Sequence, residues 1–278
     1  MTVNLHTHTY RCGHASGTER EYIEKAISAG ITHMGFSEHI PFPLTFPDGH
    51  ISAFRLPMEQ SRDYIEELCA LRKEYRDRIT IYIGFEMEYY PRYYKEMLSY
   101  ACDLGAEYLL LGQHYIDNED FYKNSVFKPC SEESRLASYV DTVIEAMETG
   151  VFTYVAHPDV INFQGDPAIY QEQMRRICVA STGLDLPLEI NFLGIRDDRH
   201  YPRLPFWQIA GEEGCSVVFG FDAHDAAGAG DTQSLPIAKK IVDAYGLKVV
   251  PYPTLVHPQT GERTTILPRE KKKSTQSS

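Results

Sequence analysis

Nine side chains that are able to bind metal ions stand near the ends of successive predicted β-strands. Seven are imidazoles and two are carboxylates: His6, His8, His14, His39, Glu86, His114, His157, Asp222 and His224. Zinc, iron(II) and manganese accept imidazole and carboxylate ligands, and a second or third cation in one pocket needs a bridging carboxylate. Because such side chains recur at strand ends through most of the chain, the sequence predicts a multinuclear metal centre.

The elements that must position these side chains are strands that alternate with helices. Short β-rich runs occur at 3–8, 31–39, 79–88, 108–116, 152–157, 187–191 and 216–224, with a further candidate at 248–251. This alternation predicts parallel strands with right-handed crossovers, in an α/β barrel or an open doubly wound sheet. Because side chains alternate along a strand, three pairs are expected to aim into one pocket: His6 with His8, Glu86 with Glu88, and Asp222 with His224.

The helical segments between the strands carry their own signals. Thr18 and Glu21 form a capping-box pattern that predicts the start of a helix running to Ala29. Apolar residues at helical spacing predict two further helices, around 64–75 and around 136–147.

Connection lengths distinguish the two ends of the predicted sheet. The helix-to-strand turns are short and are expected to end in a left-handed glycine, namely Gly30, Gly105, Gly150, Gly183, Gly214 and Gly246. The strand-to-helix connections at 41–57, 115–130 and 192–205 are long and polar. They lie where strands end, which is the face that holds the active site in (β/α) barrels.

Composition narrows the class of protein. The 278 residues carry a net charge of −12, whereas binding to nucleic-acid backbones needs clustered Lys and Arg, so no nucleic-acid partner is expected. No apolar run is long enough to span a membrane, no signal peptide precedes the first candidate ligand, and six dispersed cysteines indicate reduced thiols in a cytoplasm. Cys12 lies among the candidate ligands, but it is expected to be a buried apolar group. We expect one domain over 1–268 and a disordered basic tail over 269–278.

Several motifs together resemble the polymerase and histidinol phosphatase (PHP) family along most of the chain. They are HTHTYRCGH, SEH, GFEMEYYP, LGQHYI, YVAHPD and GFDAH. A binuclear amidohydrolase would be expected to carry a carboxylated lysine at the end of the fourth strand, where this chain has His114. The pattern is most similar to the histidinol-phosphate phosphatase branch, which implies a distorted (β/α)7 barrel with a trinuclear metal site.

The resemblance also implies how the ligands are shared. One metal would take His6, His8, Glu86 and Asp222. Glu86 would bridge to a second metal, held also by His114 and His157. A third would take His14, His39 and His224. The metals are zinc, iron or manganese, and the residues alone do not choose among them.

Three divalent cations against two carboxylates predict a cationic pocket built to bind an anion. Metal coordination lowers the pKa of water to about 7, so a hydroxide that bridges two metals is expected to attack a phosphate monoester directly. Glu86 would hold the metals, and either Asp222 or His224 would protonate the leaving group. Arg196 is the expected phosphate ligand, and the alternative for it is a loop ion pair with Asp197 or Asp198.

The implied substrate, L-histidinol phosphate, carries an ammonium and an imidazole besides its phosphate. Carboxylates and aromatic side chains are therefore expected around its leaving group, and the candidates are Glu88, Asp159, Tyr115 and Phe42. His50 and His200, in long loops, are further candidates, and Arg199 and Arg203 are weaker phosphate candidates than Arg196. His33 and His257 are expected to be structural.

Two other functions stay open from the sequence. The chain is alternatively a PHP-family protein tyrosine phosphatase or another phosphoesterase, and a substrate screen distinguishes these. It is otherwise a non-catalytic metal-binding regulatory module, which a full set of nine ligands argues against. The oligomeric state is not indicated by any pattern.

Overall fold

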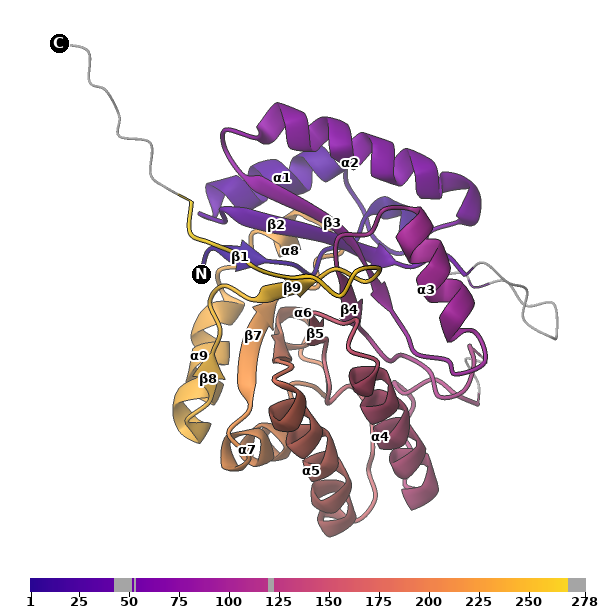
Figure 1. Ribbon diagram of the computed structural model, residues 1–278. Helices are drawn as coiled ribbons and strands as arrows, with labels where there is room; N and C mark the ends of the chain where they lie inside the picture. The colour runs from indigo at the N-terminus through magenta and orange to yellow at the C-terminus, as the bar shows by residue number, and fades with distance from the viewer. Residues whose placement is uncertain (43–51, 53, 120–122, 270–278) are drawn as a thin grey trace.

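Eight parallel strands form one curved sheet in the order of the sequence (Figure 1). The structure, a computed structural model, describes residues 1–42, 52, 54–119 and 123–269. The strands are β1 (Val3–Asn4), β2 (His33–His39), β3 (Thr80–Met87), β4 (Leu109–Leu111), β5 (Tyr154–Val155), β6 (Leu188–Asn191), β7 (Ser216–Gly220) and β8 (Lys248–Val249). Because all neighbours are parallel, the carboxyl ends of the strands gather on one rim.

Helices connect the strands and cover the outer face of the sheet (Figure 1). The longer ones are α1 (Glu19–Ser28), α2 (Ser61–Tyr75), α3 (Tyr94–Asp103), α4 (Glu133–Glu148), α5 (Pro167–Leu184), α7 (Leu204–Glu212) and α9 (Ser234–Tyr245). Shorter ones are η1 (Tyr10–Cys12), η2 (Met58–Gln60), α6 (Phe192–Arg196) and α8 (Ala226–Ala229). None of the helices in the described residues is long and apolar enough to cross a membrane.

The helical signals of the sequence are confirmed. The side chain of Thr18 accepts a hydrogen bond from the backbone N–H of Glu21, and the Glu21 carboxylate accepts one from the backbone N–H of Thr18, so the capping box opens α1. The segments 64–75 and 136–147 lie in α2 and α4, with their apolar faces buried.

The sheet closes into a barrel where the segment after β1 meets the segment after β7. Thr7 and Ala223 form a parallel bridge, and the backbone N–H of His8 donates to the carbonyl of Ala223 at 2.9 Å. The last strand of the sheet, β8, pairs with the start of β7. The predicted distorted (β/α)7 barrel is thereby confirmed, and the candidate segment 248–251 contributes one more short strand.

Tyr108 fills the barrel interior below the rim. Its hydroxyl donates to the carbonyl of Leu5 at 2.7 Å and lies 3.1 Å from the carbonyl of Phe36. Gly35 and Gly84 make room for it, because a Cβ at either position would overlap the Tyr108 side chain. A tyrosine packed against two glycines ties the first three strands together beneath the polar rim.

A hairpin closes the amino-terminal end of the barrel. Its strands are β9 (Thr254–Val256) and β10 (Arg263–Thr265). Leu255 and Ile266 bring apolar side chains into the same cluster as Val3 and Tyr108. Apolar residues therefore cover one end of the barrel, and the polar side chains gather at the other.

Two details differ from the sequence-based prediction. The strand ladders are shorter than the β-rich runs, so His6 and His8 lie beyond β1 and are held by the bridge between Thr7 and Ala223. The prediction for Gly183 is wrong: α5 continues to Leu184, and Asp185 takes the left-handed conformation at φ 50°. An aspartate tolerates that conformation better than most residues do, which explains why no glycine is needed there.

Candidate metal centre

All nine predicted metal-binding side chains converge at the carboxyl ends of the strands. Seven of them line a cavity of about 730 Å³. The other two, His6 and His8, lie beneath the cavity floor and are fully buried. The pocket expected from strand alternation is therefore present in the fold.

His6, His8 and Asp222 form the deepest group, next to Glu86. The Nε2 atom of His8 lies 3.3 Å from Asp222 Oδ1 and 3.5 Å from Glu86 Oε2. The Nε2 atom of His6 lies 3.6 Å from an oxygen of each of the same two carboxylates. His6, His8 and Asp222 lie close enough together to share one ion, and Glu86 lies beside both imidazoles.

Glu86 occupies the middle of the centre. Its Oε1 lies 2.8 Å from His157 Nε2 and 3.5 Å from His114 Nε2. Its Oε2 lies 3.1 Å from His39 Nδ1 and 3.5 Å from His8 Nε2. Oε1 also lies 3.6 Å from His6 Nε2, so Glu86 stands among five imidazoles, a position that suits a carboxylate shared by two metal ions.

The third implied set, His14, His39 and His224, is arranged less compactly. The Nε2 atoms of His14 and His224 lie 3.0 Å apart. His39 instead forms close groups with His8 and His224 and with Glu86 and His114. Cys12 lies close enough to share an ion with His14 and His224. However, its thiol donates to the carbonyl of Thr9 at 3.1 Å, and burial raises the pKa of the thiol, which favours the predicted apolar role.

Outer hydrogen bonds fix the orientation of five of the histidines through their Nδ1 atoms. The acceptors are Glu189 for His6 at 2.8 Å, Glu38 for His8 at 3.2 Å, Glu88 for His114 at 2.7 Å, and the carbonyls of Cys12 and Asp222 for His14 and His224 at 3.1 and 3.2 Å. An imidazole that donates from Nδ1 presents an unprotonated Nε2. In all five rings Nδ1 has an acceptor, which leaves Nε2 as the atom that a metal would use.

Buried polar atoms without partners support the same conclusion. Glu86 Oε2, His39 Nδ1 and His157 Nδ1 are buried and have no hydrogen-bond partner among the described residues. The first two lie 3.1 Å apart but are not aligned for a hydrogen bond. Such atoms are costly unless something else satisfies them. The donor set therefore fits divalent metal ions.

The two carboxylates are held in the charged form that a metal ligand needs. Burial opposes ionisation, but the surrounding histidines hold the pKa of Glu86 and of Asp222 well below the ordinary carboxyl value. For Asp222 the nearest contributions come from His6 and His8. Burial opposes charge on His6, His8 and His114, but the neighbouring carboxylates raise the pKa of all three, so a divalent cation bound here takes the place of protons among the same side chains.

Two of these residues have strained backbones. His157 has φ 30° and Asp222 has φ 46°, both in the left-handed region that residues other than glycine rarely adopt. Such strain persists only where the surrounding structure imposes it, and it is typical of functional sites. The backbone here turns sharply just after β5 and β7, which aims both side chains into the centre.

Arg196 reaches the cavity wall from the end of α6. Its Nη1 donates to Asp231 at 3.0 Å, and its two Nη atoms donate to carbonyl groups after β7, including that of Asp222, at 3.2 Å. The ion-pair partner is therefore Asp231 rather than Asp197 or Asp198. Asp197 pairs with Arg199 at 3.0 Å, and that arginine also lines the cavity.

The residues predicted for the leaving group are only partly brought together. Tyr115 lines the cavity. Glu88 is fully buried behind His114 and holds its Nδ1, so it orients a histidine instead of facing the cavity.

Other predicted contacts lie outside the cavity lining. Asp159 accepts hydrogen bonds from the backbone of Arg203 and from Trp207 Nε1, and burial raises its pKa to about 6. His200 Nε2 lies 2.6 Å from the carbonyl of Val160, and Phe42 packs edge-on against Tyr93. His50 lies outside the described residues.

Sequence reasoning missed the carboxylates that hold the histidines. Glu38 and Glu189 are fully buried and sit on β2 and β6. A carboxylate within a predicted barrel strand is an available signal, because lone buried carboxylates are rare. Asn191 was also missed, and its amide donates to Glu189 at 2.7 Å and to Asp222 at 3.0 Å.

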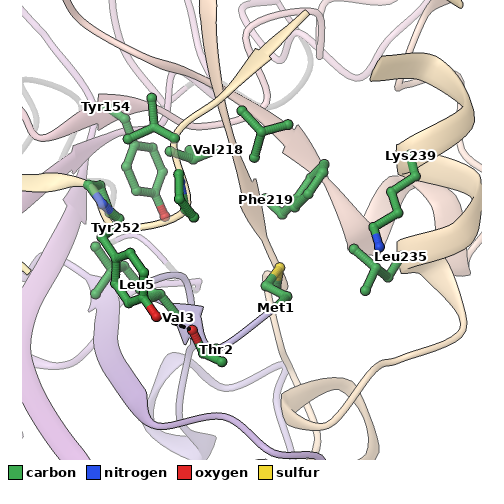
Figure 2. Close-up of a pocket in the computed structure, with 14 residues that line it drawn as sticks. Met1, Thr2, Val3, Leu5, Tyr154, Val218, Phe219, Leu235, Lys239 and Tyr252 are labelled. Carbon is green, nitrogen blue, oxygen red and sulfur yellow. Dashed lines mark hydrogen bonds between the residues drawn. The ribbon is translucent and has the colours of Figure 1, made fainter. Parts of the chain in front are cut away.

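A second cavity of about 250 Å³ lies at the other end of the barrel, between β1, β7, β8 and α9. Figure 2 shows that its walls are mainly apolar, with Val3, Leu5, Val218 and Leu235 among them. None of the described residues lining it is a histidine, a cysteine or a carboxylate. Among the residues that the structure describes, this cavity therefore offers no candidate metal ligand.

The chain is similar in sequence to proteins named as histidinol-phosphatases. It is 30% identical over 233 residues to the probable histidinol-phosphatase of Deinococcus radiodurans, a match that covers 81% of this chain and 87% of the relative. It is 25% identical to the histidinol-phosphatase of Bacillus subtilis, over 81% of this chain and 94% of that one.

The fold has a close counterpart among solved structures. The histidinol phosphate phosphatase of Lactococcus lactis, crystallised with zinc, L-histidinol and phosphate, superposes with a TM-score of 0.72 at 18% identity, covering 96% of this chain and 99% of that chain. The PHP domain family matches residues 4–191, a range that contains seven of the nine candidate ligands. With more than half of the chain matched, and with the nine side chains of the centre assembled on this barrel, the protein belongs to the PHP domain family.

Proposed function

We propose that this protein is a metal-dependent phosphomonoesterase that hydrolyses L-histidinol phosphate to L-histidinol and phosphate. The observation that carries the proposal is the set of five histidines held through Nδ1 around Glu86 and Asp222, three of which line a cavity that Arg196 and Arg199 also line. The names of the Deinococcus and Bacillus relatives support the choice of substrate.

We further propose that the centre holds three divalent ions, which are zinc, iron or manganese. His6, His8, Glu86 and Asp222 would hold the first, with Glu86 bridging to the second at His114 and His157. The third would be held by His14, His39 and His224. When bound, the ions supply a water-derived nucleophile at neutral pH and draw charge from the phosphoryl oxygens.

The protein's own side chains would then bind and orient the substrate. The Arg196 guanidinium is held by Asp231 and two backbone carbonyls, so a planar set of donors is fixed beside the metal ligands. Asp222 and His224 both line the cavity, and one of them would give a proton to the leaving oxygen. We assign this activity to residues 1–268 as one domain, with 269–278 as a tail.

The test is phosphate release from a panel of monoesters by metal-replete protein. We expect L-histidinol phosphate to give a kcat/KM at least about tenfold above those of phosphotyrosine and simple aryl phosphates. The highest value with phosphotyrosine would favour a tyrosine phosphatase. Absence of turnover with all esters at full metal content would contradict an enzymatic role.

A matched pair of histidines on β2 provides the control. His39→Asn removes a candidate ligand, whereas His33→Asn changes a histidine at the opposite end of the same strand, whose Nδ1 lies 2.9 Å from Thr32 Oγ1. We expect only His39→Asn to abolish phosphate release. Equal loss of phosphate release in both variants would mean that the location of His39 in the metal centre is not responsible for the loss.

A further inference from the structure

A buried charged cluster lies behind one wall of the cavity, next to His114. Arg55 is at its middle and is fully enclosed. Its Nε donates to Glu119 at 2.6 Å, its Nη1 donates to the carbonyl of Ile40 at 2.9 Å, and its Nη2 contacts both Glu88 and Glu119. Both carboxylates are thus anchored by one guanidinium.

The cluster has one carboxylate more than it has cations. Glu88 uses its second oxygen to accept from His114 Nδ1 at 2.7 Å. Glu119 Oε1 also accepts from the Tyr90 hydroxyl at 3.5 Å, but the side chain is 1% exposed and Oε2 has no hydrogen-bond partner among the described residues. A buried carboxylate oxygen left without a donor is costly, so it is available to a donor that a ligand brings into the cavity.

Glu119 also lines the cavity that contains the metal centre. Aromatic side chains stand on the same lining. Phe54 and Tyr115 stack with ring centroids 5.5 Å apart, and Phe127 stacks on His114 at 5.9 Å. Aromatic faces attract cations, and they attract them more strongly where water is excluded.

The cavity therefore has two regions of opposite preference. Arg196, Arg199 and the metal ligands form a region for an anion. Glu119 forms a region for a cation beside Tyr115, whereas the ring of Phe54 already has the Arg55 guanidinium over it at 4.9 Å. A ligand that fits both carries a phosphoryl group at one end and a positively charged nitrogen at the other.

We propose that Glu119 is the specificity-determining residue that binds the cationic nitrogen of the leaving group, whether that nitrogen is an ammonium or an imidazolium. This inference rests on the proposed phosphomonoesterase function and adds a recognition site to it. Arg55 positions Glu119 from behind while its contact with Glu88 steadies His114, so the recognition site and the metal centre share one support.

The test compares Glu119→Gln with the wild type on two esters, L-histidinol phosphate and 3-phenylpropyl phosphate, whose leaving group is uncharged. We expect the ratio of kcat/KM for the charged ester to that for the uncharged ester to fall by about 10- to 100-fold, as loss of a hydrogen bond to a charged group predicts. Metal content should stay at the wild-type level.

Glu107→Gln is the matched control. Glu107 lies before β4 in an ion pair with Arg72 at 2.7 Å, outside the cavity lining, so its replacement should leave the ratio unchanged. Two further esters identify the nitrogen: 2-aminopropyl phosphate retains the ammonium, and 3-(imidazol-4-yl)propyl phosphate retains the imidazole. A selective loss with either one supports the inference.

The outcomes separate the two proposals. If the wild type hydrolyses both esters and Glu119→Gln leaves their ratio unchanged, the recognition site is wrong and the hydrolytic function stands. If the metal-replete wild type hydrolyses neither ester, both proposals fail. If Glu119→Gln does not fold, the inference is tested instead by measuring how strongly two alcohols inhibit the wild-type protein. L-Histidinol should then inhibit at a concentration about tenfold or more below that of 3-phenylpropan-1-ol, and equal inhibition would overturn the inference.

Discussion

Glu189 accepts a hydrogen bond from Nδ1 of His6 at 2.8 Å across the barrel interior, and both side chains are fully buried. The contact links β6 to the segment after β1. It leaves His6 Nε2 facing Glu86 and Asp222, so a residue that touches no cavity surface sets the orientation of a central candidate ligand.

Replacing Glu189 with glutamine should therefore weaken metal binding. We expect Glu189→Gln to lower metal affinity about 10- to 100-fold, because outer partners of ligating histidines have effects of this size. Metal titration of the metal-free protein measures it. Asp141→Asn, which alters a surface ion pair with Arg176, is the control that should bind metal normally. Unchanged affinity in Glu189→Gln would mean that this contact does not orient a ligand.

Gly112 should tolerate no side chain. A Cβ at this position would overlap the carboxylate of Glu86, so Gly112→Ala should displace Glu86 and reduce metal content while the fold persists. Gly183→Ala is the control, because a Cβ there meets no atom within 4 Å and the residue lies in α5. Elemental analysis and circular dichroism check both variants. Full metal content in Gly112→Ala would contradict the central position of Glu86.

Removal of Arg196 should affect substrate more than metal. We expect Arg196→Ala to keep its metals but to lose about one to two orders of magnitude in kcat/KM, as loss of a hydrogen bond to a charged group predicts. The loss should be similar for L-histidinol phosphate and an aryl phosphate, since both present the same phosphoryl group. Loss with L-histidinol phosphate alone would mean that Arg196 contacts the leaving group. No loss at all would leave only its structural role of bonding Asp231 and the Asp222 carbonyl.

Asp231 should make the stability of the protein depend on pH. Burial opposes its ionisation, but Ser234 and Arg196 donate to its carboxylate and hold its pKa below the ordinary value of 3.8. A carboxyl whose pKa is lowered by folding contributes stability above its unfolded pKa and loses that contribution as pH falls.

Asp231→Asn should accordingly lower the free energy of unfolding by about 1 to 2 kcal/mol at neutral pH. The gap between variant and wild type should narrow below about pH 4, where the unfolded carboxyl takes up a proton. Urea unfolding of the two metal-free proteins over this range measures the gap. A gap that does not change with pH would show that the charge of Asp231 is not responsible.

Residue order left a barrel and an open sheet as alternatives, and the family resemblance implied the barrel, whereas the gathering of the candidate ligands at one rim followed from residue type and strand order. His114 lies three residues beyond the end of β4, yet its position after the fourth β-rich run was enough to bring it to Glu86. The reason is general, since parallel strands deliver whatever follows their carboxyl ends to one rim.

The supporting contacts depended on geometry that a single sequence does not contain. Glu38 precedes His39 on β2, and strand alternation would turn it away from the pocket, but it reaches His8 because the neighbouring segment lies alongside it in the closed barrel. Glu119 lies in a long loop without periodicity, and only its buried contact with Arg55 reveals it. We predicted Glu88 as a substrate contact because strand alternation shows to which side of the sheet a side chain points. Alternation does not show how far beneath the cavity floor that side chain lies.

The central claim is that this protein hydrolyses L-histidinol phosphate at a multinuclear metal centre. The most direct test is the rate of phosphate release from that ester by metal-free protein as zinc, iron(II) or manganese is added back. We predict no release without metal and, for at least one of these ions, a rise to a plateau at about three equivalents per chain. Release that persists in the metal-free protein, or that reaches its plateau at one equivalent, would contradict the claim.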